Sequence, residues 1–345
     1  MTALFPYGSI LGDSCVASSA PWIIGFGDML EWSPFALSFG YLQPSTVSIA
    51  LAPRIKAKIG RFKEGWTKVS FNGMSEEHPS QEARFDTPLS VYFLCASHMG
   101  ATGIHIEITS ELPCELDMVR NGASIVSVVN ALCKTRVAAG FSPTSNTALV
   151  NLACELGRVA GSSLDRLGQI GSAFGGVRQW LWSETTNFGC IDLAPARGQF
   201  IEQNLAMVYL PSRTSPMVHR RNSRERFLAG QDRWIWFEIS QLVKDFAQAL
   251  RALDGGHLAA LLRGESELRR ILGDYPQGGL EQLLVDSAAE QGCGARVSLL
   301  DAGTCVWAMG PVEHIGALTM EWSLALRDRS LGCLITPKIE VEGVC

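Results

Sequence analysis

The sequence predicts an α+β fold built as two lobes, and three observations lead to this prediction. The chain has 345 residues, of which 47% are hydrophobic and 18% charged, so it is long enough to bury a sizeable core. Segments with strand-like alternation dominate its first part, whereas apolar residues at helical spacing dominate its last part. No repeat, low-complexity tract or long linker interrupts the chain. We therefore expect an N-terminal lobe over residues 1–195 and a C-terminal lobe over residues 196–345, with mixed sheets and helices packed on one side.

The expected strands begin in the first lobe. The segment Ile104–Ile108 alternates apolar and polar residues, which hides one face of a strand and exposes the other. The other predicted strands are Val47–Leu51, Ile55–Ile59, Thr67–Asn72, Val177–Trp182 and Leu205–Leu210. The polar stretch Met74–Asp86 is predicted to be a mobile loop.

The expected helices follow the strands. Asn121–Val137 predicts a long buried helix and Thr144–Val159 a second one, with Ser145 or Asn146 placed to cap it. Apolar residues at helical spacing predict further helices at Ile239–Arg251, Leu258–Leu272, Leu280–Gln291 and Glu313–Leu326. Between the last two, Ala295–Met309 has the pattern of a strand, a turn and a second strand.

Composition and charge exclude several classes of partner. The formal net charge of −5 argues against a nucleic-acid-binding surface. No apolar run approaches the roughly 18 residues that span a bilayer, and Met1–Pro6 lacks a basic region ahead of an apolar stretch. We therefore expect a cytoplasmic protein with no nucleic-acid or membrane partner. The ten cysteines include no Cys-x-x-Cys pair, so we expect reduced thiols and no zinc site.

Four groups of segments then occur in a recognisable order. They are Ala20–Asp28 with Ser33–Gly40, Ile106–Pro113 with Ala123–Leu132, Ala173–Gly176, and Gly292–Ser298 with Cys305–Gly310. In order and spacing they resemble the GHMP kinase superfamily, named after galactokinase, homoserine kinase, mevalonate kinase and phosphomevalonate kinase, and within it the heptose phosphate kinase branch. The resemblance covers most of the chain and implies a two-lobed GHMP kinase-like fold.

The residues that serve ATP in that superfamily are replaced here. Its Gly-Leu-Gly-Ser-Ser loop wraps phosphates with bare backbone amides, whereas Cys114–Ser124 carries side chains that obstruct this approach. Its aspartate base and following glutamine correspond to Gly168 and Gln169, and a glycine cannot take a proton. The glycines of its third motif become Leu299–Thr304. These replacements predict that the usual ATP pose is lost.

The superfamily also has a non-kinase branch, the ribofuranosylaminobenzene 5′-phosphate synthases and the similar C-nucleoside synthases, which use phosphoribosyl pyrophosphate (PRPP). Polar and charged replacements in the cleft favour a different phosphorylated donor. We therefore predict a PRPP-dependent C-ribosyl synthase of C-nucleoside antibiotic biosynthesis. It would join ribose 5-phosphate to an aromatic amino-carboxylate with loss of pyrophosphate and CO2. Because CO2 leaves in place of a proton, this reaction needs no base at Gly168.

The resemblance implies four groups of site residues. Acidic residues expected to stabilise the cationic ribose centre are Asp28, Asp117 and Asp301. Residues expected to bind the phosphate of PRPP are Arg120, Asn121, Gly122, Ala123 and Ser124. Residues expected to bind either the acceptor carboxylates or the ribose 5-phosphate are Arg213, His219, Arg220 and Arg221. Residues expected to hold Mg2+ are Glu115, Asp117 and Asp301. Each group also has a purely structural interpretation. The phosphate-binding residues would form an ordinary capped helix, the acidic residues would be solvated, and the basic residues would form a solvated loop.

Two other functions stay open. One is a divergent sugar or heptose phosphate kinase that uses ATP, with Asp165 as a replacement base three positions before Gly168. The other is a catalytically inactive pseudokinase scaffold. We also consider a homodimer as the assembly of this protein. Five aromatic residues invite a stacking role, but their alternation on strand-like segments favours core or interface packing: Trp180, Trp182, Trp234, Trp236 and Phe237.

Overall fold

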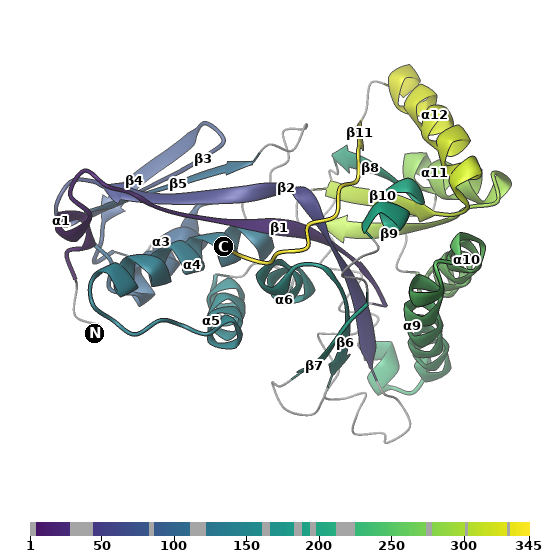
Figure 1. Ribbon diagram of the computed structural model, residues 1–345, viewed down its shortest axis with the longest axis horizontal. Helices are drawn as coiled ribbons and strands as arrows, with labels where there is room; N and C mark the ends of the chain where they lie inside the picture. Colours follow the sequence, from purple (N-terminus) through teal and green to yellow (C-terminus); the bar gives the residue numbers. More distant parts are fainter. Residues whose placement is uncertain are drawn as a thin grey trace.

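The computed structural model describes residues 5–27, 44–82, 86–110, 122–160, 166–182, 188–193, 198–211, 225–273, 278–300, 303–329 and 332–345. It contains two sheets, each accompanied by helices (Figure 1). The mixed α+β fold class is therefore confirmed, whereas the division between residues 195 and 196 stays a prediction.

The first sheet has seven strands in the order β4-β3-β5-β2-β6-β7, with β1 also paired to β2. The strands are β1 (Val16–Phe26), β2 (Ser45–Arg61), β3 (Trp66–Phe71), β4 (Met74–Pro79), β5 (Ile104–Ser110), β6 (Val177–Trp182) and β7 (Phe188–Asp192). The pair β3 and β5 is parallel, and the other pairs are antiparallel.

Two strand predictions are corrected. The predicted strands on either side of Pro53 are one 17-residue strand, β2, because β1 pairs with both halves. The register shifts between Ala20 and Trp22, so Pro21 of β1 and Pro53 of β2 both lie at an irregularity of this strand pair. A proline has no amide hydrogen to donate to a neighbouring strand, and it is tolerated at such a position. The first part of the predicted loop Met74–Asp86 is instead the strand β4, which ends at Pro79. It pairs with β3 through a turn in which Asn72 and Gly73 both have positive φ (44° and 88°). Asn-Gly is the preferred sequence for such a hairpin.

Helices of the first lobe cover one face of this sheet (Figure 1). They are α3 (Ser90–His98), α4 (Gly122–Ala138), α5 (Asn146–Val159) and α6 (Arg166–Phe174), with the short α1 (Tyr7–Leu11) at the sheet's end. The predicted cap of α5 is confirmed, because Ser145 Oγ accepts a hydrogen bond from the Ala148 amide at 3.3 Å. The segment Ala173–Gly176 forms the end of α6 and the bend before β6.

The second sheet has four strands in the order β11-β8-β10-β9. They are β8 (Leu205–Pro211), β9 (Gly294–Leu300), β10 (Gly303–Met309) and β11 (Cys333–Ile335). The helices of this lobe are α7 (Gly198–Gln203), α9 (Arg233–Ala252), α10 (Gly255–Leu272), α11 (Gly279–Glu290) and α12 (Val312–Arg329). Val208 and Val306 pack with α11 and α12, whereas Met207 and Trp307 on the opposite face join the core of the first lobe. The two lobes therefore share one hydrophobic core.

The last residues of the chain return to the first lobe, where Figure 1 shows them as a yellow trace along β1 and β2. The Ala52 amide donates to Lys338 O at 2.8 Å, and the Glu340 amide donates to Ala50 O at 2.9 Å. Arg54 donates from Nη1 to Glu340 Oε2 at 2.9 Å and from Nη2 to Gly343 O at 2.5 Å. The C-terminal segment is thus bound to the sheet by backbone hydrogen bonds and by an ion pair.

The cysteines depart from expectation at one position. Cys333 of β11 is disulfide-bonded, so the expectation of reduced thiols is wrong there. Cys95 and Cys305 are free and buried, and burial raises the pKa of each thiol to about 12, which fits inert core filler. Among the residues that the structure describes, no helix is long and apolar enough to cross a membrane.

Candidate functional site

Two helix N-termini point toward the end of β1. Helix α4 runs antiparallel to β1, because Asn130 Nδ2 donates to Ser18 Oγ (2.9 Å) and Lys134 Nζ to Ala17 O (3.2 Å) near the start of that strand. Helix α6 packs beside it, with an ideal Cβ on Gly171 only 2.9 Å from the Ile23 side chain. At the end of α6, Ala173 O accepts a hydrogen bond from the Val344 amide, and the adjacent Cys345 amide donates to Ser19 O of β1. Helix α6 therefore also runs antiparallel to β1, and the first turn of each helix lies toward Phe26. Since helix N-termini carry partial positive charge, this end of the sheet favours an anion.

The end of β1 also meets the second lobe. Phe26 stacks on Phe246 of α9, with ring centroids 4.2 Å apart and an interplanar angle of 18°. The next residue, Gly27, has φ of 92°, and an ideal Cβ there would lie 2.1 Å from Val243 Cγ2. Only glycine fits this contact without a shift of α9. The anion-favouring region therefore lies at the junction of the two lobes.

A buried cluster of charges stands behind this junction. Glu265 Oε1 accepts hydrogen bonds from Arg269 Nε and from Arg296 Nη1, each at 2.8 Å. The relative exposures of Glu265, Arg269 and Arg296 are 0%, 6% and 2%. The Arg296 guanidinium lies 5.9 Å from the Phe26 ring centroid and that of Arg269 4.9 Å from the Trp236 ring. The charged groups of Glu265, Arg269 and Arg296 therefore lie together beside the end of β1, in surroundings that screen them weakly.

This cluster was missed in the sequence. Glu265 and Arg269 are four residues apart on α10, a spacing that usually marks an exposed helix pair. Arg296 lies in Gly292–Ser298, one of the segments that carry the resemblance, but nothing in that segment indicates an ionic partner for its side chain. Only the packing of α10 against β9 brings the third charge into contact.

Three of the predicted phosphate-binding residues are visible at the start of α4. Gly122, Ala123 and Ser124 are buried in its first turn. Tyr92 donates its hydroxyl to Ser124 Oγ at 2.8 Å, and Ser127 Oγ donates to Ser124 O at 3.0 Å. The Ser124 hydroxyl is thus held within the core, and a phosphate contact from this turn stays a prediction.

The other predicted site residues lie outside the described part of the chain. They are Asp28, Glu115, Asp117, Arg120, Asn121, Arg213, His219, Arg220, Arg221 and Asp301, together with the replacement base Asp165. Within the described part, no group of three His, Cys, Asp or Glu side chains could hold a metal ion.

The position aligned with the family's base lies inside α6. Gly168 and Gln169 are both buried, and Gln169 Nε2 donates to Ala153 O at 3.3 Å, so its amide ties α6 to α5. The residue at 168 itself offers no group that exchanges a proton. If this chain uses a base, the base comes from another position.

Three of the tryptophans considered for a stacking role are buried in the protein interior. Trp180 donates to Ser48 Oγ at 2.8 Å and Trp182 to Thr46 Oγ1 at 3.0 Å, and both rings are buried. Trp236 is also buried, but on helix α9, so the expected strand there is wrong. The packing interpretation is confirmed for these three residues and for Phe237, which packs against the same cluster as Trp236. Core packing is wrong for Trp234, which is 56% exposed.

No family model and no curated protein matches the sequence. Solved structures do match over nearly the whole chain. The D-glycero-D-manno-heptose 1-phosphate kinase from Bacteriodes thetaiotaomicron aligns with a TM-score of 0.67 at 15% identity, covering 95% of this chain and 97% of its own. The Methanococcus jannaschii mevalonate kinase gives 0.67 at 14%, covering 95% and 99%. The Lactococcus lactis galactokinase complexed with galactose gives 0.66 at 14%, covering 98% and 97%.

These matches correct the predicted activity. They are kinases, so they contradict the prediction of a PRPP-dependent, decarboxylating C-ribosyl transferase of C-nucleoside biosynthesis and favour the kinase alternative. The specific resemblance to the synthase branch is likewise not supported. At these identities the likeness concerns the fold, and this chain has the fold of the GHMP kinases.

Proposed function

We propose that the protein is an ATP-dependent phosphotransferase that acts on a small hydroxylated metabolite of the sugar or sugar phosphate class. The observation that carries the proposal is the convergence of α4 and α6 on the end of β1, beside the buried charges of Glu265, Arg269 and Arg296. The fold shared with sugar and heptose phosphate kinases supports it.

Phosphoryl transfer depends mainly on positioning and on stabilising negative charge. The partial positive charge of the two helix N-termini would attract and orient a phosphate, and Arg296 would add the field of a guanidinium that is not lost by deprotonation. Because Arg296 is held by Glu265 in the core, we assign it a role through its field rather than through direct contact.

Magnesium accompanies ATP in such reactions and takes oxygen ligands. One similar structure, at 16% identity, is a complex with MVAPP, AMPPCP and magnesium. The described residues fit a phosphate but provide no carboxylate set for the metal. Glu115, Asp117 and Asp301 remain the proposed ligands by sequence, and we route no step through the metal.

Asp165 directly precedes the first residue of α6 and is our proposed base for the substrate hydroxyl. The test is ADP release from Mg-ATP over a panel of sugars and sugar phosphates, with ATP binding measured in parallel by calorimetry. Asp165→Asn should abolish ADP formation while ATP still binds. Asp286→Asn, an exposed acid on α11, is the matched control and should retain activity.

The outcomes separate the parts of the proposal. Full turnover in Asp165→Asn would remove Asp165 as the base. Absence of both ATP binding and ADP release in the unmodified protein, over the whole panel, would overturn the proposed function and favour an inactive scaffold.

A further inference from the structure

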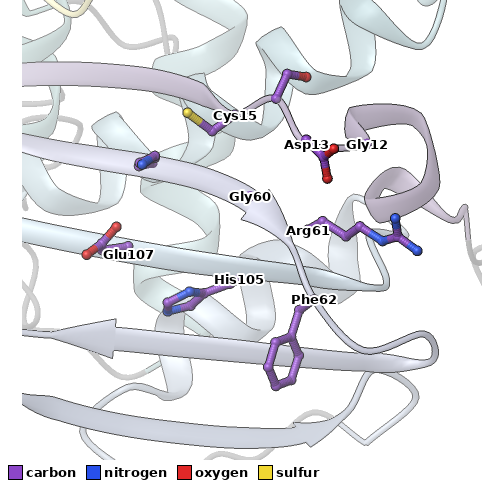
Figure 2. A pocket seen from close by; sticks show the side chains of 10 residues that line it. Gly12, Asp13, Cys15, Gly60, Arg61, Phe62, His105 and Glu107 are labelled. Atoms are coloured by element: carbon purple, nitrogen blue, oxygen red, sulfur yellow. The ribbon is translucent and has the colours of Figure 1, made fainter.

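We propose a second ligand site on the outer face of the first sheet, for a small phosphorylated molecule with a planar ring, of the nucleoside monophosphate class. A pocket of about 530 Å³ lies there, between the turn that joins α1 to β1 and the strands β2 and β5. This volume suits a ligand of that size. Figure 2 shows Glu107 at one end of the pocket and Asp13 and Arg61 at the other, with His105 and Phe62 between them.

The pocket is separate from the proposed phosphotransfer site. Its lining residues Lys58 and Glu107 alternate along β2 and β5 with Ile59 and Ile106, which point into the core under the helices. The pocket therefore opens on the face of the sheet opposite α4 and α6. The inference goes beyond the proposed function and does not depend on it.

Hydrogen bonds hold the walls of the pocket in place. The amide and hydroxyl of Ser14 both donate to Leu11 O, at 2.9 and 2.5 Å, which closes the turn before β1. The Phe62 amide donates to Gly103 O at 2.7 Å. On the floor, Ser70 Oγ and His105 Nε2 are 2.7 Å apart. A pocket with walls fixed in this way loses little freedom when a ligand enters.

Basic residues supply the anion-binding element. Residues 54–68 carry six basic residues and a single acidic one, Glu64, in a chain of net charge −5. Two of them, Lys58 and Arg61, line the pocket. Within the described part of the chain, neither has an ion-pair partner, although Glu107 lies directly opposite Lys58 in the strand register. A lysine and an arginine with available donors are suited to a phosphate.

The floor supplies a surface for a ring. The Phe62 and His105 rings are 6.3 Å apart at 52°, and Lys68 Nζ lies 5.7 Å from the Phe62 centroid. Burial lowers the pKa of His105, and the positive charge of Lys68 lowers it further, so the imidazole is neutral. Neutral aromatic side chains stack on nucleobases with little sequence preference.

The two carboxylates narrow the class of ligand. Asp13 and Glu107 repel a ligand that carries only negative charge, but they accept hydrogen bonds from hydroxyl groups. A ligand with one phosphate, a diol and a planar ring satisfies the cations, the carboxylates and the aromatic floor together. Inorganic phosphate or a nucleoside alone satisfies only part of the pocket.

The test is calorimetric titration of the full chain with adenosine 5′-monophosphate (AMP), inorganic phosphate and adenosine. AMP should bind at least ~10-fold more tightly than either fragment. The double variant Lys58→Ala, Arg61→Ala should weaken AMP binding by at least ~10-fold, and Phe62→Ala by less. The matched control is Lys63→Ala, because this lysine lies over Trp66 at 4.0 Å and does not line the pocket.

Repeating the titration with saturating Mg-ATP separates this pocket from the proposed phosphotransfer site. AMP affinity should persist under ATP, and the double variant should keep the ADP-forming rate of the unmodified protein. Three results would overturn the proposal: no AMP binding, complete displacement of AMP by ATP, or equal loss of affinity in Lys63→Ala and in the double variant.

Discussion

The buried charge cluster yields a prediction whose magnitude follows from its geometry. Glu265→Gln keeps the shape of the side chain but leaves the guanidinium groups of Arg269 and Arg296 without their shared carboxylate. All three residues are at most 6% exposed, so water cannot replace the lost charge. Removing one partner from a buried ion pair costs about 3–5 kcal/mol, and we expect a loss of that size in the free energy of unfolding.

The matched control is Glu155→Gln. Glu155 also pairs with an arginine on its own helix, at 2.8 Å from Arg158, but the two side chains are 65% and 61% exposed. Exposed pairs contribute about 0–1 kcal/mol, so this variant should be almost as stable as the unmodified protein.

Urea denaturation measures both variants, with the midpoint and slope giving the free energy of unfolding. Tryptophan fluorescence is a suitable signal, because Trp236 lies under the Arg269 guanidinium. If Glu265→Gln lost less than about 1 kcal/mol, with an unchanged slope, the reasoning about an uncompensated buried charge would be refuted.

Three further predictions concern packing, the C-terminal segment and pH. Gly294→Ala should cost about 1–3 kcal/mol of stability, because an ideal Cβ at this position of β9 lies 2.0 Å from the backbone oxygen of Ala259 in α10. Arg54→Ala removes the ion pair to Glu340 and should speed amide hydrogen exchange over residues 338–345. Burial lowers the pKa of His105 from 6.5, so the unfolded chain binds a proton that the folded chain does not, and stability falls as the pH decreases below about 6.5. His105→Asn should flatten this part of the curve of stability against pH.

Each of these predictions has a control. Gly316→Ala, where an ideal Cβ meets nothing within 4 Å, should leave stability unchanged or raise it by up to about 1 kcal/mol, and equal losses at both glycines would contradict the packing argument. Arg158→Ala should not alter exchange in the C-terminal segment. An unchanged pH slope in His105→Asn would show that this histidine is not the group responsible.

The local sequence pattern was sufficient to predict elements in which the order of apolar and polar residues reflects their burial. The alternation of Ile104–Ile108 predicted β5, and the apolar run after Asn121 predicted α4. Strand β4 was missed because its residues are polar on an edge, although the Asn72-Gly73 turn announced a hairpin. The return of residues 338–345 to β1 and β2 carries no local pattern, since its partners lie almost 300 positions earlier.

The candidate site could be predicted only in part. Glu265 and Arg296 are 31 positions apart, and nothing near either residue announces their contact. The predicted ribosyl transfer was wrong for a related reason. Replaced glycines and a missing aspartate at Gly168 indicate which contacts are lost, but they do not indicate which chemistry takes their place. The altered motifs did not conceal the fold, which is similar to that of the heptose 1-phosphate kinase and of the mevalonate kinase over nearly the whole chain.

The central claim, ATP-dependent phosphotransfer, is tested most directly by thermal unfolding of the full chain with Mg2+ and either ATP or PRPP. A ligand that binds only the folded state raises the midpoint in proportion to the logarithm of its concentration above Kd. We predict a rise with ATP that grows with its concentration, and no change with PRPP. A rise with PRPP alone, or no rise with either ligand, would contradict the account.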